Sequence, residues 1–336
     1  MGGEPTAPDA GGELLVPAVT GAARPDPRAL PASPATRFAP APTGFLHLGH
    51  LVNAIYVWGI AAATGGRVML RVEDHDRQRS RPEYEAALLD DLERLGLAPD
   101  DPPIVSFRAG TTPWRQSDNG PAYTAALDRL RGAGLVYPCS CTRTTFAAYE
   151  AEHSRSWRGP GCPGHCRAAA LDEAGAWAAS PAEPGLGLRV AVGAGSERWV
   201  DLLAGPVADE PAAGGDLLAR DRVGNWTYAF CAVVDDTAGG VDLVIRGRDL
   251  LDATPVQLRL ARLLGRDTPP RFLHHPLVRR VSGQKLSKAG RDTAVREMLD
   301  AGATPAALFG RAARLAGLRE GEAPIEPSAL SSLFVG

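Results

Sequence analysis

The chain has 336 residues, 44% of them apolar, and a formal net charge of −3 at pH 7. This composition allows a substantial buried core with room for two or three compact units. It excludes a generally basic nucleic-acid-binding protein, so any contact with RNA must come from local Arg and Lys patches. The sequence has neither a long uncharged apolar run nor the core of a signal peptide, so we expect a soluble, cytoplasmic protein without a membrane span, and we expect a monomer.

The N-terminal part of the chain changes character near residue 36. Residues 1–35 are rich in Pro, Ala and Gly and predict a disordered extension. Strands and helices are then expected to alternate, with a strand at 37–39, a helix at about 49–63, a strand at 67–72 and a helix at about 82–95. This order predicts an α/β fold with a parallel sheet and helices on both faces, whose functional sites lie at the carboxyl ends of the strands.

The second half divides into three further regions. Residues 136–215 contain clustered cysteines, short strands and Pro/Gly-rich connections, which predict a zinc-binding insertion between two halves of one catalytic domain, 36–135 and 216–290. Within the second half of the catalytic domain, 216–290, we expect a strand at 241–245, a helix at 255–264 and a strand at 271–273. A helical C-terminal segment is expected over 291–336.

A histidine motif follows the first predicted strand. His47 and His50 stand three apart where the strand gives way to a helix, and Gly49 lets a ligand approach the backbone. The imidazoles and the helix N-terminus can hydrogen-bond the phosphates of ATP. Taken alone, the motif is weak evidence for such a site, because helix-capping and core histidines are common.

A lysine motif follows the last predicted strand of the sheet. Lys285 and Lys288 lie in a Gly-preceded loop, and lysine is a flexible point charge suited to phosphate. The pattern alone is also typical of a solvated surface. Its position after the histidine motif, across an α/β core, favours a joint role in binding ATP.

With both motifs present, the chain resembles the class I aminoacyl-tRNA synthetases, whose signatures are His-Ile-Gly-His and Lys-Met-Ser-Lys-Ser. The segments Arg37-Phe-Ala-Pro-Ala-Pro-Thr-Gly-Phe-Leu-His-Leu-Gly-His50 and Arg71-Val-Glu-Asp-His-Asp-Arg77 resemble the glutamyl-tRNA synthetase group, over residues 36 to about 310. The resemblance implies a Rossmann-like catalytic domain and a ligase that activates glutamate with ATP and Mg²⁺. It assigns a catalytic role to His47, His50, Lys285 and Lys288, and ATP binding to His47, Gly49, His50 and Lys288. Ala289 replaces the last serine of the lysine signature, so we expect a modest rate of activation.

A glutamate site needs cations for the carboxylates and a carboxylate for the ammonium group. Arg37, Glu73 and Arg246 can supply these charges, although each also fits an ordinary ion pair at a strand end. The resemblance implies a pocket formed by Arg37, Phe38, Ala39, Pro40, Ala41, Glu73, Tyr228 and Arg246.

Four of the five cysteines cluster in the predicted insertion as Cys139-x-Cys141 and Cys162-x-x-x-Cys166. Four thiolates at this spacing can hold one tetrahedral Zn²⁺, which would be structural because no position is left open for water. The alternative is a set of four free buried cysteines. Cys231 stands apart, and we expect it to be a small core residue.

Only residues 289–336 follow the lysine motif. They are too few to form the large helical domains with which a glutamyl-tRNA synthetase reads an anticodon. The chain therefore resembles the short members of the group, which transfer glutamate to queuosine in the anticodon loop of tRNA(Asp). A ligase with another acceptor, a non-catalytic paralogue that binds glutamate or nucleotide, and a small-molecule nucleotidyltransferase remain alternatives.

Overall fold

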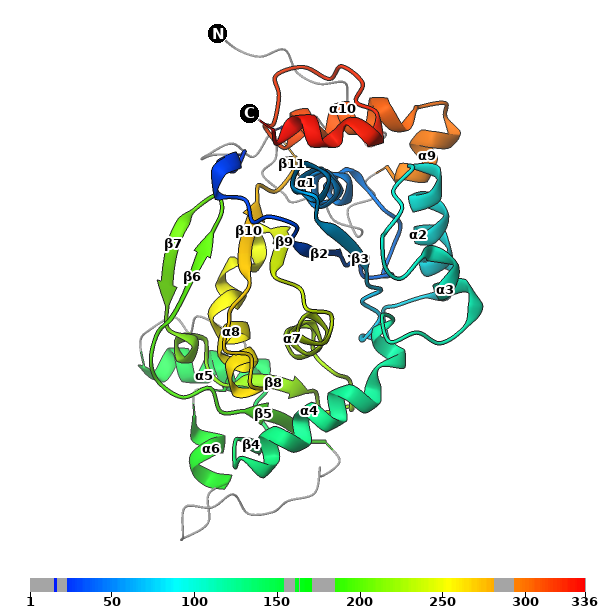
Figure 1. The fold of residues 1–336 in the computed structure, drawn as a ribbon. Coiled ribbons are helices and arrows are strands. Elements are labelled where there is room, and N and C mark those ends of the chain that lie inside the picture. The colour runs from blue at the N-terminus through cyan, green and yellow to red at the C-terminus, as the bar shows by residue number, and fades with distance from the viewer. Residues whose placement is uncertain are drawn as a thin grey trace.

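The structure is a computed structural model that describes residues 15–16, 23–153, 161–162, 164–170, 185–280 and 293–335 (Figure 1). Its centre is a sheet whose strands are mainly parallel. Strand β2 (Ala35–Phe38) pairs with β3 (Arg67–Leu70), and β10 (Arg271–His275) pairs with both β9 (Leu243–Gly247) and β6 (Glu197–Asp201), all in parallel. β7 (Gly205–Asp209) adds an antiparallel edge to β6.

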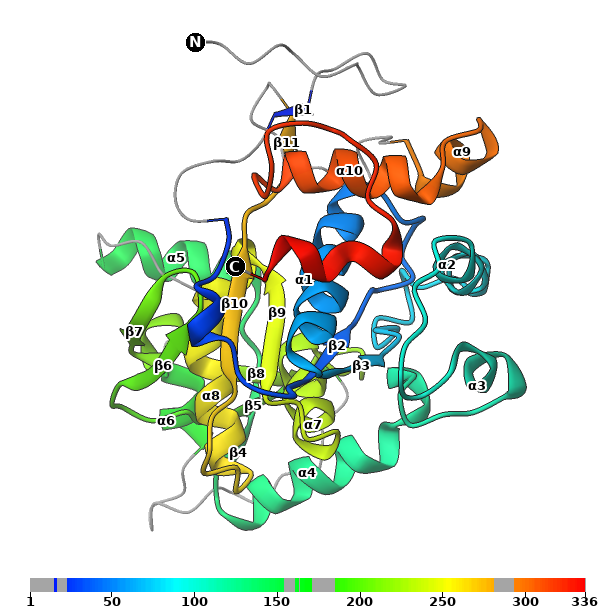
Figure 2. The same cartoon turned by 45° about the horizontal axis from the view of Figure 1, so that its top comes forward.

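The two parallel groups of strands lie side by side. β2 runs alongside β9, and the backbone N–H of Asp242 donates to the carbonyl of Ala35. The central sheet therefore has the spatial order β7-β6-β10-β9-β2-β3 (Figure 2). Both faces are covered by apolar side chains, because α1 (Leu48–Thr64) packs on one face and α8 (Thr254–Leu263) on the other. The predicted α/β fold class is confirmed.

The remaining helices surround this sheet. They are α2 (Pro82–Arg94), α3 (Ile104–Ala109), α4 (Gly120–Gly132), α5 (Arg143–His153), α6 (His165–Ala170), α7 (Tyr228–Ala238), α9 (Val295–Asp300) and α10 (Pro305–Leu315), with short 3-10 turns η1 (Pro27–Ala29), η2 (Gln116–Asp118), η3 (Pro211–Gly214), η4 (Arg248–Ala253) and η6 (Pro327–Leu333). No helix within these described ranges is long and apolar enough to cross a bilayer.

Helix α1 is the most buried helix contacting the candidate site, and its sequence explains its limits. It begins after His47, whose side chain accepts a hydrogen bond from a backbone N–H of the first turn. It ends at Gly65, which has a φ of 67°, a left-handed conformation that glycine adopts without steric cost. The C-terminal segment covers it, since Tyr56 lies 5.4 Å from the ring of Phe334. The predicted helix at 49–63 is confirmed within one residue at each end.

A second, antiparallel sheet has the order β4-β5-β8, formed by β4 (Val136–Cys139), β5 (Gly187–Val190) and β8 (Leu217–Arg220). It lies with α5 and α6 at the end of the molecule opposite α9 and α10 (Figure 1). The division of the chain at 135/136 and 215/216 stays a proposal. Two strand pairings cross these boundaries. β8, from the predicted second half of the catalytic domain, joins the β4-β5 sheet, and β6, from the predicted insertion, joins the central sheet.

The segment before β2 contacts the body of the protein. The guanidinium of Arg24 donates to the carbonyl of Leu318, and the Tyr56 hydroxyl donates to the carbonyl of Ala23. Further upstream, β1 (Leu15–Val16) pairs with β11 (Arg279–Arg280). The predicted N-terminal extension therefore includes a described part, residues 23–34, that is held against the core.

Candidate active site and metal centre

A cavity of about 590 Å³ opens at the carboxyl ends of β2, β9 and β10. Every predicted ATP- or glutamate-binding residue that the structure describes lines it, namely Arg37, Phe38, Ala39, Pro40, Ala41, His47, Gly49, His50, Glu73, Tyr228 and Arg246. Lys285, Lys288 and Ala289 lie outside the described residues. Segments far apart in the sequence thus meet at one cavity, as the strand-end argument predicts.

The two histidines adopt one defined arrangement at the start of α1. The backbone N–H of Gly49 donates to Nδ1 of His47, and the backbone N–H of His47 donates to Nδ1 of His50, each over 3.1 Å. Because each Nδ1 accepts, a neutral imidazole must carry its proton on Nε2. Both rings can therefore present an Nε2–H donor, the group that a phosphate oxygen requires.

A network of buried charges lies beneath the cavity floor. The Arg71 side chain is fully buried and contacts Glu73 Oε1 at 2.7 Å and Asp236 Oδ1, while Asp235 lies 3.8 Å away. Arg37 Nε donates to the same Asp236 oxygen at 3.0 Å. Burial lowers the pKa of Arg71, but the charges of Asp236, Glu73 and Asp235 together raise it well above its usual value. These contacts hold Arg37 and Glu73 in fixed positions at the cavity wall.

Arg246 differs from the buried Arg37 and Arg71, which contact carboxylates, because its partners are neutral. Its guanidinium donates to Gln257 Oε1 at 2.6 Å, Thr254 Oγ1 at 2.8 Å and His274 Nε2 at 3.0 Å, and the Tyr228 hydroxyl lies at 3.5 Å. Among the described residues, no carboxylate lies within ion-pair distance of it. Only 5% of Arg246 is exposed, and burial lowers its pKa. A buried cation without a counter-ion at a cavity wall is a site for an anionic group.

Other residues, which no sequence motif indicates, line the same cavity. Asn53 on α1 and His275 at the end of β10 contact each other, with Asn53 Nδ2 and His275 Nε2 3.1 Å apart. Arg79, in a turn, and Asp249, in η4, also line the cavity. The signal for His275 was available, because it stands at the carboxyl end of a strand that the sequence predicts.

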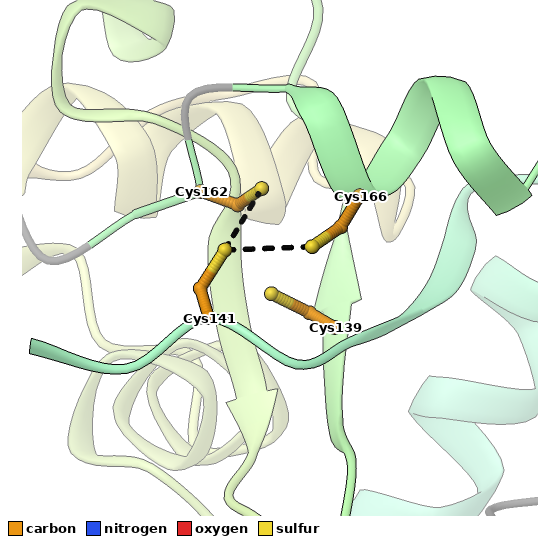
Figure 3. Close-up of side chains that lie close together, drawn as sticks. All are labelled: Cys139, Cys141, Cys162 and Cys166. Carbon is orange, nitrogen blue, oxygen red and sulfur yellow. Dashed lines mark hydrogen bonds between the residues drawn. The ribbon is translucent and has the colours of Figure 1, made fainter. Parts of the chain in front are cut away.

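The four clustered cysteines converge in the structure (Figure 3). All four Sγ atoms lie within 4.8 Å of one another, and Cys141 Sγ is 3.6 Å from Cys162 Sγ and 3.4 Å from Cys166 Sγ. Four sulfurs around a tetrahedral zinc, each about 2.3 Å from the metal, are roughly 3.8 Å apart. The cysteine cluster therefore fits a closed Zn²⁺ site.

The surroundings of the cysteine cluster also suit thiolates. Arg189 Nε, on a buried side chain, donates to Cys139 Sγ at 3.0 Å, and the backbone N–H of Gly164 donates to Cys162 Sγ at 3.4 Å. A hydrogen bond from the Cys139 thiol lowers the pKa of Cys162, whereas the same bond and burial raise the pKa of Cys139. Cys231 lies elsewhere, fully buried in the core, as predicted.

The family model for the catalytic domain of class I tRNA synthetases (E and Q) matches residues 35–324. The chain belongs to this family and is a ligase of the class I aminoacyl-tRNA synthetase type. Two similar relatives are called Glutamyl-Q tRNA(Asp) synthetase. That of Symbiobacterium thermophilum is 40% identical over 89% of this chain and 91% of its own length, and that of Nitratidesulfovibrio vulgaris is 38% identical over 84% and 86%. The resemblance predicted from the two motifs is thereby confirmed.

A solved structure supports the fold. The chain resembles a glutamate tRNA ligase from Elizabethkingia meningosepticum, in complex with its amino acid, with a TM-score of 0.69 at 23% identity. The match covers 89% of this chain and 64% of that chain. At this identity the likeness concerns the fold alone.

Proposed function

We propose that this enzyme activates glutamate with ATP as glutamyl-adenylate and transfers the glutamyl group to queuosine in the anticodon loop of tRNA(Asp). The observation that carries the glutamate assignment is the charge arrangement of the cavity. One buried carboxylate, Glu73, faces a cavity also lined by two buried guanidiniums, Arg37 and Arg246. An amino acid with two carboxylates and one ammonium group complements this set. The names of the relatives support both glutamate and the queuosine acceptor.

The chemistry requires no covalent enzyme intermediate. A glutamate carboxylate oxygen attacks the α-phosphorus of ATP, the bond to pyrophosphate breaks, and an acceptor hydroxyl later attacks the mixed anhydride and releases AMP. His47 and His50 stabilise the phosphate charge through their Nε2–H donors, and Lys285 and Lys288 add positive charge. Mg²⁺ bound to the ATP phosphates would offset the charge of the leaving pyrophosphate.

Glutamate activation is expected without tRNA, because Arg246 and Glu73 are already held by hydrogen bonds within the protein alone. ATP–pyrophosphate exchange with a panel of amino acids tests this. We expect exchange with glutamate and not with glutamine, in the absence of any RNA. Strict dependence on tRNA, or equal exchange with glutamine, would contradict the proposal. No exchange with any amino acid would favour a non-catalytic binding protein.

Glycine at position 49 is expected to be necessary for ATP use. A Cβ at this position would lie 2.9 Å from Cε1 and 3.1 Å from Nδ1 of His47, so Gly49→Ala should displace the imidazole that the Gly49 N–H holds. We expect the transition state of ATP-dependent exchange to lose about 1–3 kcal/mol of stabilisation. The matched control is Gly132→Ala, since a Cβ there meets no atom within 4 Å. Equal activity of the two variants would contradict the role of Gly49.

The cysteine cluster is proposed to hold one structural Zn²⁺ through Cys139, Cys141, Cys162 and Cys166. Zinc would tie the end of β4 to the start of α6 and so support the insertion, away from the catalytic cavity. We expect metal analysis of protein purified without added zinc to find one ion per chain.

Cys162→Ala should lose the ion and destabilise the insertion while the central sheet stays folded. Cys231→Ala is the control, because Cys231 is equally buried but outside the cysteine cluster. Zinc-free wild-type protein with four titratable thiols would remove the assignment.

A further inference from the structure

Three polar side chains form a chain of hydrogen bonds across neighbouring strands of the central sheet. Asp201 ends β6, His274 lies on β10, and Arg246 lies directly opposite His274 on β9. Asp201 Oδ2 is 2.6 Å from His274 Nδ1, and Arg246 Nε is 3.0 Å from His274 Nε2. Asp201 and His274 do not line the catalytic cavity, and they are at most 4% exposed.

The donor and the acceptor of each hydrogen bond follow from the chemistry of the groups at the two ends, Arg246 and Asp201. A guanidinium N–H can only donate, so His274 Nε2 must be the acceptor and must lack a proton. Nδ1 then carries the proton of the neutral ring and donates to Asp201. Burial lowers the pKa of His274, which keeps the ring neutral. Burial would raise the pKa of Asp201, but hydrogen bonds from His274, Ala204 and Leu203 lower it, so the acceptor stays ionised.

The arrangement holds Arg246 without a direct counter-ion. A carboxylate in contact with the guanidinium would fix it equally well but would neutralise the charge that an incoming carboxylate needs. The imidazole instead separates Asp201 from Arg246, and the other partners, Gln257 and Thr254, are also neutral. Phe272 lies beside both groups, with its ring stacked on His274 and 5.4 Å from the Arg246 guanidinium carbon.

We infer that Asp201 and His274 are positioning residues of the glutamate pocket. Asp201 selects the His274 tautomer with its proton on Nδ1, and His274 then orients the Arg246 guanidinium toward the substrate carboxylate while leaving its charge available. This role rests on the proposed function, because it presumes that Arg246 binds glutamate. It adds two residues that support the pocket from behind, and neither belongs to a sequence motif.

The test compares two replacements of His274 in tRNA-free pyrophosphate exchange. His274→Leu removes the acceptor for Arg246 Nε, and we expect the KM for glutamate to rise about 10-fold or more. The KM for ATP and kcat should change little. His274→Gln can place its amide oxygen near the former Nε2, and it should restore most of the glutamate KM. An unchanged glutamate KM in His274→Leu, an equal rise in both KM values, or failure of His274→Gln to rescue would overturn the positioning role.

A second variant tests the tautomer and guards against misfolding of His274→Leu. Asp201→Asn can keep the oxygen that accepts from the backbone N–H groups of Leu203 and Ala204, but it turns an amide N–H donor toward His274 Nδ1. That favours the tautomer with Nε2–H facing Arg246, so the glutamate KM should rise. The backbone N–H of residue 274 also donates to Asp201 Oδ2, and Asp201→Asn loses that bond in either background. In the His274→Gln background the change should therefore have little further effect on the glutamate KM, since no tautomer remains to be set.

Additive effects of these two changes would overturn the tautomer argument. Wild-type protein without glutamate-dependent exchange would instead overturn the proposed function and the inference together. Normal wild-type exchange with unaltered variants would overturn only the inference.

Discussion

Arg246→Ala is expected to weaken glutamate binding by about 2–5 kcal/mol, the cost of removing one partner of a buried, hydrogen-bonded charge pair. The effect should be large because the guanidinium has only neutral partners among the described residues and is almost entirely buried. Calorimetric titration with glutamate, and separately with ATP, gives the comparison. ATP affinity should change by much less.

The control for this variant is Arg266→Ala. Arg266 is half-buried, less buried than Arg246. Its pKa is likewise lowered by burial, and it donates to the carbonyl of Val241, but it does not line the catalytic cavity. Its removal should leave glutamate affinity unchanged. If Arg246→Ala weakened glutamate and ATP equally, Arg246 would be a structural residue.

Arg71→Met is expected to cost about 3–5 kcal/mol of folding stability at pH 7, because it leaves buried carboxylates without their cation. Arg71 is fully buried against Glu73, Asp235 and Asp236, and methionine restores volume but no charge. Urea unfolding of variant and wild type at pH 7 measures the loss. A loss near zero would mean that Arg37 alone compensates Asp236.

The loss of folding stability in Arg71→Met is expected to depend on pH. In the wild type, burial would raise the pKa of Asp236, but the charges of Arg37 and Arg71 lower it below its usual 3.8. This contribution to stability is fully present above the usual pKa and is lost as pH falls through the lowered value. Arg71→Met removes one of the two positive charges that lower the pKa of Asp236, so burial should raise that pKa in the variant. The stability deficit should therefore shrink as pH falls from 7 toward 5, and a constant deficit would contradict this account.

The parts of the site that the sequence revealed are those that belong to short, contiguous motifs. His47 and His50 are three residues apart, and the cysteine pairs have characteristic metal-ligand spacing. Such short spacings predict both the chemistry of the side chains and their closeness in space. The strand and helix pattern then placed Glu73 and Arg246 at the same edge of a parallel sheet. The cavity brings these residues together.

The parts that the sequence did not reveal depend on distant residues. Helix α7 was not predicted, because its buried Asp235 and Asp236 interrupt the apolar pattern that marks a buried helix. Their burial makes sense only beside Arg37 and Arg71, which come from the other half of the sheet. Such pairing is a property of the folded chain.

The order of the strands in space was equally hidden. Asp201 belongs to the region predicted as an insertion, yet β6 pairs with β10 and so lies two strands away from Arg246. No local pattern indicates that a strand from this region enters the central sheet.

The measurement that tests the central claim most directly follows glutamate to its acceptor. The protein is incubated with labelled glutamate, ATP and tRNA(Asp), and nuclease digestion then identifies the labelled nucleoside. Our account predicts the label on queuosine and none on tRNA(Asp) from a queuosine-deficient strain. Label on the 3′-terminal adenosine, or equal labelling of the unmodified tRNA, would contradict it.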